Sequence, residues 1–277
     1  MKISKRQIAG MNICYGFFSF DYFLNSMQRL GLHSIEVHGA APHLYFPDLT
    51  AGEIQSIGKN IIAHNLEVIC FTPEQCKYPV NIAYKDDYAR ERSLRYLESS
   101  IRICTSLGCS RMLVTPGYGY FDEPREEAWK RSAESLFRLT AAAEKEGVTL
   151  VLEPLRQDET NLVTSLTSLK EMLDTIHSPA LKGMLDTSPM YFAGEHIRDY
   201  FTCLGKDLNH IHFIDGMPEG HLVWGDGIFP LDEYVKDVVD GEYRGYLTIE
   251  LTSPRYYHNP HGAMERTMQA LAPYVYV

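Results

Sequence analysis

Four segments rich in strand-forming residues each carry an ionisable residue at or near the last position of the predicted strand. They are TLVLEPL with Glu153, LKGMLDT with Asp186, NHIHFID with His212 and YLTIEL with Glu250. Three carboxylates and an imidazole brought together would repel one another and lack solvation unless a cation joined them. Three oxygen donors, one nitrogen donor and no thiolate favour Mn²⁺, with Mg²⁺, Co²⁺ or Zn²⁺ as alternatives. The other interpretation is that each residue is a structural polar group satisfied by its neighbours.

The segments that carry these residues belong to a regular alternation of strands and helices. Strand-like runs cover residues 8–14, 34–39, 66–72, 111–117, 149–154, 181–187, 209–215 and 246–251. Helical periodicity lies between them, as where Leu94, Leu97, Ile101 and Cys104 recur every three or four residues. This count of units and the length of 277 residues predict an α/β fold, a single (β/α)₈ TIM-barrel domain over residues 1–277.

An open doubly wound sheet accommodates the same alternation, so the positions of the polar residues decide between the two folds. In a barrel the carboxyl ends of the strands meet on one face, whereas in an open sheet they spread along a rim. Side chains alternate along a strand, so Val151 shares a face with Glu153, and Met184 shares one with Asp186. The apolar set of each strand can therefore face the helices while the polar residue points into the barrel mouth, which favours the barrel.

Composition and charge argue against some classes of binding partner. The formal net charge of −10 and the pI near 5.5 argue against nucleic acid or an anionic membrane as the main partner. The six cysteines show no C-x-x-C spacing and are interpreted as reduced thiols. Neither a signal peptide nor an apolar run of about 18 residues is evident, so we expect a cytoplasmic protein that does not enter the membrane.

The four motifs resemble the sugar isomerase/epimerase superfamily with xylose-isomerase-like barrels. The resemblance implies that Glu153, Asp186, His212 and Glu250 bind one divalent metal ion, commonly Mn²⁺. The runs IEVHGAAPHLYFPDL, FTPEQCKYPVN and RERSL, and the later GDG, are similar to the fructoselysine 3-epimerase group. Relatives of this kind are usually dimers or tetramers, so a homo-oligomer is implied as well.

The activity that the resemblance implies is C3 epimerisation of a ketose or ketosamine through a metal-stabilised enediolate. Glu153 and Glu250 would then act both as ligands and as the two bases on opposite faces of the sugar carbon. Four alternatives stay open: a ketose 3-epimerase for free sugars, an aldose–ketose isomerase, an inosose-type dehydratase, and a barrel that only binds sugar. Too few histidines accompany the acidic ligands for the three-zinc cluster of an endonuclease.

Further polar and aromatic residues are predicted to contact the sugar. The resemblance places Glu159, six residues beyond Glu153, against the substrate, although a solvated loop carboxylate explains it equally well. His38 and His43 follow the second predicted strand and can hydrogen-bond sugar hydroxyls, and Trp224 can wall the pocket. Each of these has a plain structural role as its alternative.

Two nearby residues are interpreted as interior rather than as ligands. His210 lies one layer deeper than His212, and Glu36 shares the inner face of its strand with His38. The chain also has Pro189 and Pro218 where epimerases of free ketoses carry a sugar-binding His and Arg. This departure leaves room for a substituted sugar.

Overall fold

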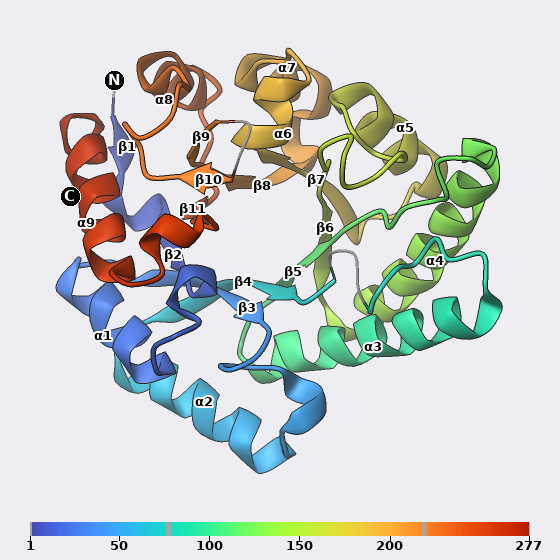
Figure 1. The fold of residues 1–277 in the computed structure, drawn as a ribbon, viewed down its shortest axis with the longest axis horizontal. Coiled ribbons are helices and arrows are strands. Elements are labelled where there is room, and N and C mark those ends of the chain that lie inside the picture. The colour runs from blue at the N-terminus through green and yellow to red at the C-terminus, as the bar shows by residue number, and fades with distance from the viewer. Residues whose placement is uncertain (1, 76–78, 218–219, 277) are drawn as a thin grey trace.

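A closed barrel of parallel strands forms the centre of the structure, a computed structural model that describes residues 2–75, 79–217 and 220–276. Around the barrel the strands follow one another in the order β11-β2-β3-β4-β5-β6-β7-β8 (Figure 1). Their bounds are β2 Ile8–Met11, β3 Ser34–Gly39, β4 Glu67–Pro73, β5 Arg111–Val114, β6 Thr149–Leu152, β7 Leu181–Asp186, β8 Leu208–His212 and β11 Leu247–Ile249. The predicted (β/α)₈ barrel is confirmed, and each predicted strand segment overlaps one of these strands, although β4 and β8 each extend one residue beyond the predicted segment.

Helices surround the barrel, as Figure 1 shows. Their bounds are α1 Phe20–Arg29, α2 Ala51–Ala63, α3 Asp87–Ser106, α4 Arg125–Glu146, α5 Leu166–Ile176, α6 Thr187–Phe192, α7 Ile197–Leu204, α8 Leu231–Asp240 and α9 Pro260–Leu271. Two short strand pairs complete the fold. β1 (Ile3–Ser4) pairs with β12 (Val275–Tyr276) near the chain ends, and β9 (Asp215–Gly216) pairs antiparallel with β10 (His221–Leu222) after β8.

Local sequence signals explain where the helices begin and end. The Ser19 side chain accepts a hydrogen bond from the backbone of Tyr22 and starts α1, and Thr50 and Glu53 form a reciprocal capping box at α2. Gly147 ends α4 in the left-handed conformation, with φ of 66°, which a residue without Cβ adopts at no steric cost. The turn after α4 delivers the chain directly into β6 and hence to Glu153.

Two apolar regions pack on the two faces of the barrel strands. The larger lies between the strands and the helices, and the smaller lies inside the barrel. The inner cluster consists of Ala9, Ile69, Cys70, Leu113, Val151 and Met184. Since Val151 and Met184 point inward, the alternation predicted for β6 and β7 is confirmed, and the residue two positions later in each strand segment also faces the interior.

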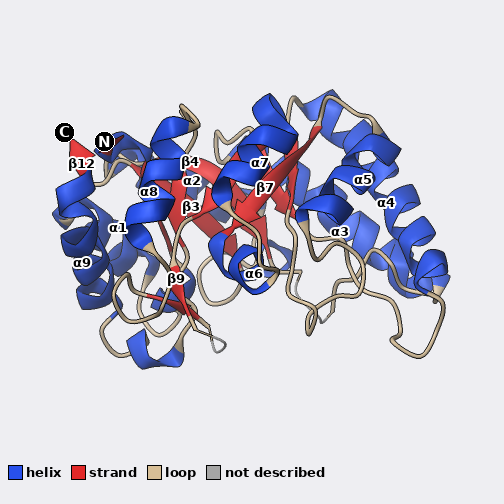
Figure 2. Cartoon of the chain, turned by 90° about the horizontal axis from the view of Figure 1, so that it is seen from above, coloured by secondary structure: helices blue, strands red, loops and turns tan. Residues whose placement is uncertain are grey.

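The carboxyl ends of the strands open onto one side of the barrel. In Figure 2, α6, β9 and several long loops lie on the side away from the two chain ends. The cysteines of the described residues are unpaired: Cys14, Cys70, Cys104 and Cys109 are buried and Cys203 is exposed, while Cys76 lies outside the described residues. Of the helices in the described ranges, none has the length and apolar character that crossing a membrane requires.

Candidate metal centre and active site

The four residues predicted as ligands meet at the carboxyl ends of four adjacent strands. Glu153 follows β6, Asp186 ends β7, His212 ends β8 and Glu250 follows β11. All four side chains are at least 85% buried, and that of His212 is almost completely enclosed. Asp186 also begins α6, because its carboxylate accepts a hydrogen bond of 2.6 Å from the backbone N–H of Ser188.

The geometry around His212 Nδ1 fits a bound cation. This nitrogen lies 3.4 Å from Glu153 Oε1, 3.5 Å from Asp186 Oδ2 and 3.2 Å from Glu250 Oε2. It is buried and has no hydrogen-bond partner, although three carboxylates surround it. Atoms that bind one ion at about 2.1 Å are separated by about 3.0–3.5 Å, and Nδ1 of His212 lies at such a distance from each of the three oxygens. The orphaned nitrogen and the three convergent oxygens therefore suit a divalent ion held by these four residues.

A buried carboxylate holds His212 in the orientation that this site requires. His212 Nε2 lies 3.1 Å from Glu36 Oε1 within hydrogen-bonding geometry, and His210 Nε2 lies 2.7 Å from Glu36 Oε2. The hydroxyl of Thr72 also donates to Glu36. Because the Glu36 carboxylate accepts from Nε2–H of His212, the lone pair of Nδ1 is directed at Glu153, Asp186 and Glu250. The sequence placed Glu36 and His210 in the interior but did not predict this link.

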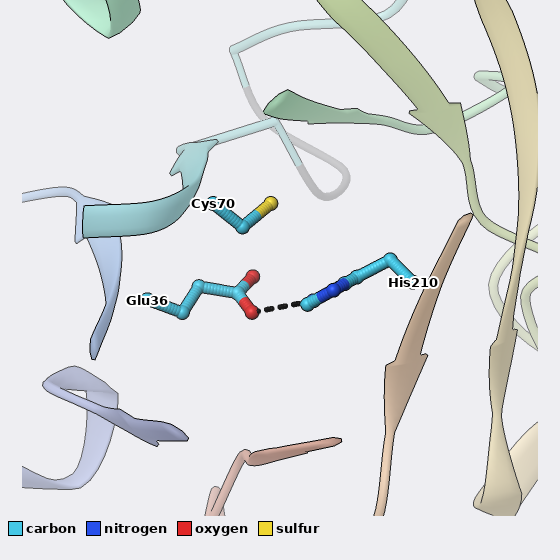
Figure 3. Close-up of side chains that lie close together, drawn as sticks. All are labelled: Glu36, Cys70 and His210. Atoms are coloured by element: carbon cyan, nitrogen blue, oxygen red, sulfur yellow. Dashed lines mark hydrogen bonds and ion pairs between the residues drawn. The ribbon is translucent and has the colours of Figure 1, made fainter. Parts of the chain in front are cut away.

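Glu36, Cys70 and His210 also lie close together in the barrel interior (Figure 3). We interpret this cluster as a hydrogen-bonded network, because the Glu36–His210 contact of 2.7 Å has hydrogen-bond geometry. Burial raises the pKa of Cys70 well above its usual value, so its thiol stays protonated and binds metal poorly.

The two glutamates at the mouth have different electrostatic surroundings. Burial raises the pKa of Glu153 to about 7 in spite of the nearby His212. Burial acts in the same direction on Glu250, but the imidazoles of His212 and His221 outweigh it and hold the pKa of Glu250 below its usual value. The site thus contains two carboxylates that lie close to one nitrogen and differ in proton affinity, an arrangement suited to moving a proton.

His38 and Glu159 are two of the four residues that were predicted to contact the sugar. His38, at the end of β3, lies at the mouth with its Nε2 3.4 Å from Glu74 Oε2. Glu159 is half-buried in the loop after β6, where its Oε2 accepts a hydrogen bond of 3.1 Å from the backbone of Arg156. Both remain predictions as substrate contacts.

His43 and Trp224 have structural surroundings instead. Both ring nitrogens of His43 are occupied, by the Asn12 side chain at 3.0 Å and the carbonyl of Phe18 at 2.8 Å. Trp224 is buried, donates from Nε1 to the carbonyl of Phe213 and packs on its ring. The structure therefore favours a supporting role for these two residues, because no polar atom of either ring is left for a sugar.

Sequence reasoning assigned no role to two residues of the segment after β8. His221, on β10, has its Nδ1 2.8 Å from Glu250 Oε2 and its Nε2 3.7 Å from Asp186 Oδ2. Asp215, on β9, accepts hydrogen bonds of 2.8–2.9 Å from the backbone N–H groups of Gly216, Gly225, Gly227 and Phe229. The turn-forming sequence GDG that follows was the one available signal for this loop. Pro189 lies in the first turn of α6, and Pro218 lies outside the described residues.

Replacing Asp215 by Ala will lower the free energy of unfolding by roughly 2–4 kcal/mol, because several buried backbone donors lose their acceptor. It will also weaken divalent-metal binding, since β9 and β10 carry His221 to the site. Urea denaturation and metal titration measure the two effects. Asp240→Asn, on the exposed face of α8, is the control and should change neither quantity; equal effects of the two substitutions would contradict the supporting role of Asp215.

Comparisons with known proteins agree with this architecture. The model of the xylose isomerase-like TIM barrel family matches residues 24–274. Fructoselysine 3-epimerase of Shigella flexneri is 33% identical over 260 residues, which cover 91% of this chain and 93% of that protein. The chain belongs to the xylose isomerase-like TIM barrel family. Within it, the chain is an enzyme of the isomerase class, of the carbohydrate-epimerase type.

Solved structures show the same fold at lower identity. D-psicose 3-epimerase from Clostridium cellulolyticum H10, solved with D-tagatose, superimposes with a TM-score of 0.79 at 18% identity and covers 98% of this chain and 96% of that one. The IOLI protein, solved with a bound zinc atom, superimposes with a TM-score of 0.79 at 18% identity and covers 99% of each chain. These matches establish the fold, and a member of it binds a divalent ion.

Proposed function

We propose that this protein is a divalent-metal-dependent epimerase that inverts C3 of a ketose or a ketosamine of the fructoselysine type. The observation that carries the proposal is the pair of largely buried carboxylates, Glu153 and Glu250, which lie 3.4 Å and 3.2 Å from Nδ1 of His212. Sugar binding alone requires no such pair, whereas inversion of a carbon requires one base on each face. The relatives that are named fructoselysine 3-epimerase and D-psicose 3-epimerase support the same reaction class.

Glu153, Asp186, His212 and Glu250 would hold the ion, and we propose Mn²⁺ because the donors are mainly carboxylate oxygens without a thiolate. When bound, the ion supplies Lewis acidity at the ketose carbonyl, which makes the neighbouring C3 proton more acidic. One glutamate then removes the C3 proton, and the other delivers a proton to the opposite face. The buried position of both carboxylates excludes water that would otherwise compete for the proton.

A cavity beside the site supports a substituted sugar. It has a volume of about 380 Å³ and is lined by segments that follow the ligand strands, including Arg156, Asp158, Pro189 and Phe192. Arg156 lies three residues beyond Glu153, and Pro189 lies three residues beyond Asp186. The paired charges of Arg156 and Asp158 match the carboxylate and ammonium groups that a sugar-linked lysine carries.

The proposal is tested by incubating the Mn²⁺-loaded protein in D₂O with a panel of ketoses and ketosamines and following deuterium by NMR. Deuterium at C3 together with the C3 epimer is the expected result for at least one compound. Deuterium at C1 with an aldose product would indicate an isomerase, and loss of water would indicate a dehydratase. Absence of exchange at every carbon of every compound would refute a proton-transfer enzyme.

Replacing Arg156 by Ala will raise KM for a ketosamine about 10-fold, since a charge-assisted hydrogen bond to the lysine carboxylate is lost. Turnover of a free ketose will change little, because it does not reach the cavity. Steady-state kinetics with a ketosamine and with a free ketose measure these two effects. Lys170→Ala, on the exposed face of α5, serves as the matched loss of a positive charge. A similar loss of activity of Arg156→Ala with both substrates would contradict the assignment of the cavity to the lysine part of a ketosamine.

A further inference from the structure

His221 lies close to the proposed metal ligands but belongs to a loop hairpin and not to the end of a barrel strand. It belongs to β10, and its side chain is 19% exposed, compared with 1% for His212. It therefore covers the side of the centre nearer to solvent, while His212 closes the side nearer to the barrel interior. The strand pattern of the sequence does not predict a metal-site residue at the position of His221.

The contacts of His221 connect it with two of the proposed ligands. Its ring lies with Nδ1 2.8 Å from Glu250 Oε2 and Nε2 3.7 Å from Asp186 Oδ2. Asp186, His221 and Glu250 form a second group of ligand atoms close enough to share one ion, and this group has Asp186 in common with the group of Glu153 and His212. The two groups also meet directly, because His212 Nδ1 lies 3.2 Å from Glu250 Oε2.

The unpartnered ring nitrogen of His221 favours a ligand over a hydrogen-bond donor. Nδ1 of His221 is buried and has no hydrogen-bond partner, although Glu250 Oε2 is within reach. His212 Nδ1 shows the same combination of close carboxylates and an unpartnered nitrogen. A buried nitrogen without a hydrogen-bond partner, beside a carboxylate that is itself a proposed ligand, is available to an ion that the carboxylate also binds.

Hydrogen bonds fix the backbone of the hairpin at His221. The backbone N–H of His221 donates to the Thr252 hydroxyl at 3.2 Å, two residues beyond Glu250. Asp215 binds the backbone on the far side of the hairpin through Gly225 and Gly227, and the Tyr256 hydroxyl accepts from the N–H of Val223 at 3.1 Å. These hydrogen bonds fix the backbone that carries the imidazole, as a preformed site requires.

We infer that His221 is a fifth protein ligand of the divalent ion, bound through Nδ1. The inference rests on the metal centre of the proposed function but goes beyond the four strand-end ligands. It makes the centre one of three carboxylates and two imidazoles, and it assigns a metal-binding role to the loop between β8 and α8. Each imidazole binds as the neutral form, and each comes from a different element of the fold.

The number of nitrogens bound to Mn²⁺ tests the inference directly. ELDOR-detected NMR of the Mn²⁺-loaded protein, labelled with ¹⁵N-histidine and free of sugar, resolves nitrogens that bind the ion. Two are expected in the wild-type chain and one in His221→Gln, with a dissociation constant for Mn²⁺ that is about 10–100-fold higher in the variant. His33→Gln, an exposed residue before β3, is the matched control and should leave the count and the affinity unchanged.

One bound nitrogen in the wild-type protein would overturn the role of His221 and leave the four-ligand centre intact. This count does not depend on whether the variant folds. No Mn²⁺ binding at all would overturn the metal centre, and with it the proposed function. Because no sugar is present, an unsuitable substrate cannot produce either result.

Discussion

Replacing Glu153 or Glu250 by Gln will reduce epimerisation by roughly 10²–10⁴-fold while the protein stays folded, because each variant lacks one of the two bases. Glutamine keeps the volume of the side chain and an oxygen that can bind the ion. It cannot take up the C3 proton. Circular dichroism and the rate of C3-epimer formation measure the two expectations.

Each variant should still exchange the C3 proton on one face of the sugar. The remaining glutamate can remove the C3 proton from one face and return deuterium to the same face in D₂O. Glu153→Gln is therefore expected to exchange the C3 proton of one epimer only, and Glu250→Gln that of the other. Glu146→Gln, at the exposed end of α4, is the control and should behave as the wild type. The two-base mechanism would be contradicted if either variant epimerised at the wild-type rate. It would also be contradicted if both variants exchanged the C3 proton of the same epimer.

Replacing Glu36 by Ala will affect both stability and metal binding. The carboxylate is completely buried and accepts hydrogen bonds from Thr72, His210 and His212. Although burial favours its neutral form, the two imidazoles hold the pKa of Glu36 well below its usual value, so it is charged in the folded protein. Its removal leaves these partners unpaired in the interior, and we expect a loss of about 3–5 kcal/mol in the free energy of unfolding.

The same substitution releases His212 from its orientation, so the dissociation constant for Mn²⁺ should rise about 10–100-fold. Calorimetric titration with Mn²⁺ and denaturation by urea separate the two effects. Cys70→Ala is the matched control, because Cys70 is equally buried in the same interior cluster but makes no hydrogen bond to His212. Its Mn²⁺ affinity should equal that of the wild type. Weakened binding in Cys70→Ala, or wild-type binding in Glu36→Ala, would contradict the orienting role of Glu36.

Much of the candidate site follows from the sequence because its determinants are local. Alternation along β6 and β7 placed Val151 and Met184 inside the barrel, and the residue two positions on had to share that face. A charged residue at the end of such a strand is costly unless it is paired, which singled out Glu153 and Asp186. Closure of the barrel then brings the four strand ends together.

The supporting interactions could not be read from local pattern. Glu36 and His212 are 176 residues apart and lie on β3 and β8, so their contact exists only because the barrel closes. His43 resembled a substrate contact in the sequence, but Asn12 and Phe18 occupy its ring nitrogens in the folded chain. Whether a polar side chain is satisfied by the protein depends on neighbours that no sequence spacing specifies.

By itself, the sequence determined the barrel and the four strand-end residues, because periodicity and the ends of strands are properties of short segments. The tertiary structure alone decided that Glu36 orients His212 and that the loop after β8 carries His221 to Glu250. The physical reason is that a loop's path depends on long-range hydrogen bonds, such as those that Asp215 accepts from four backbone groups.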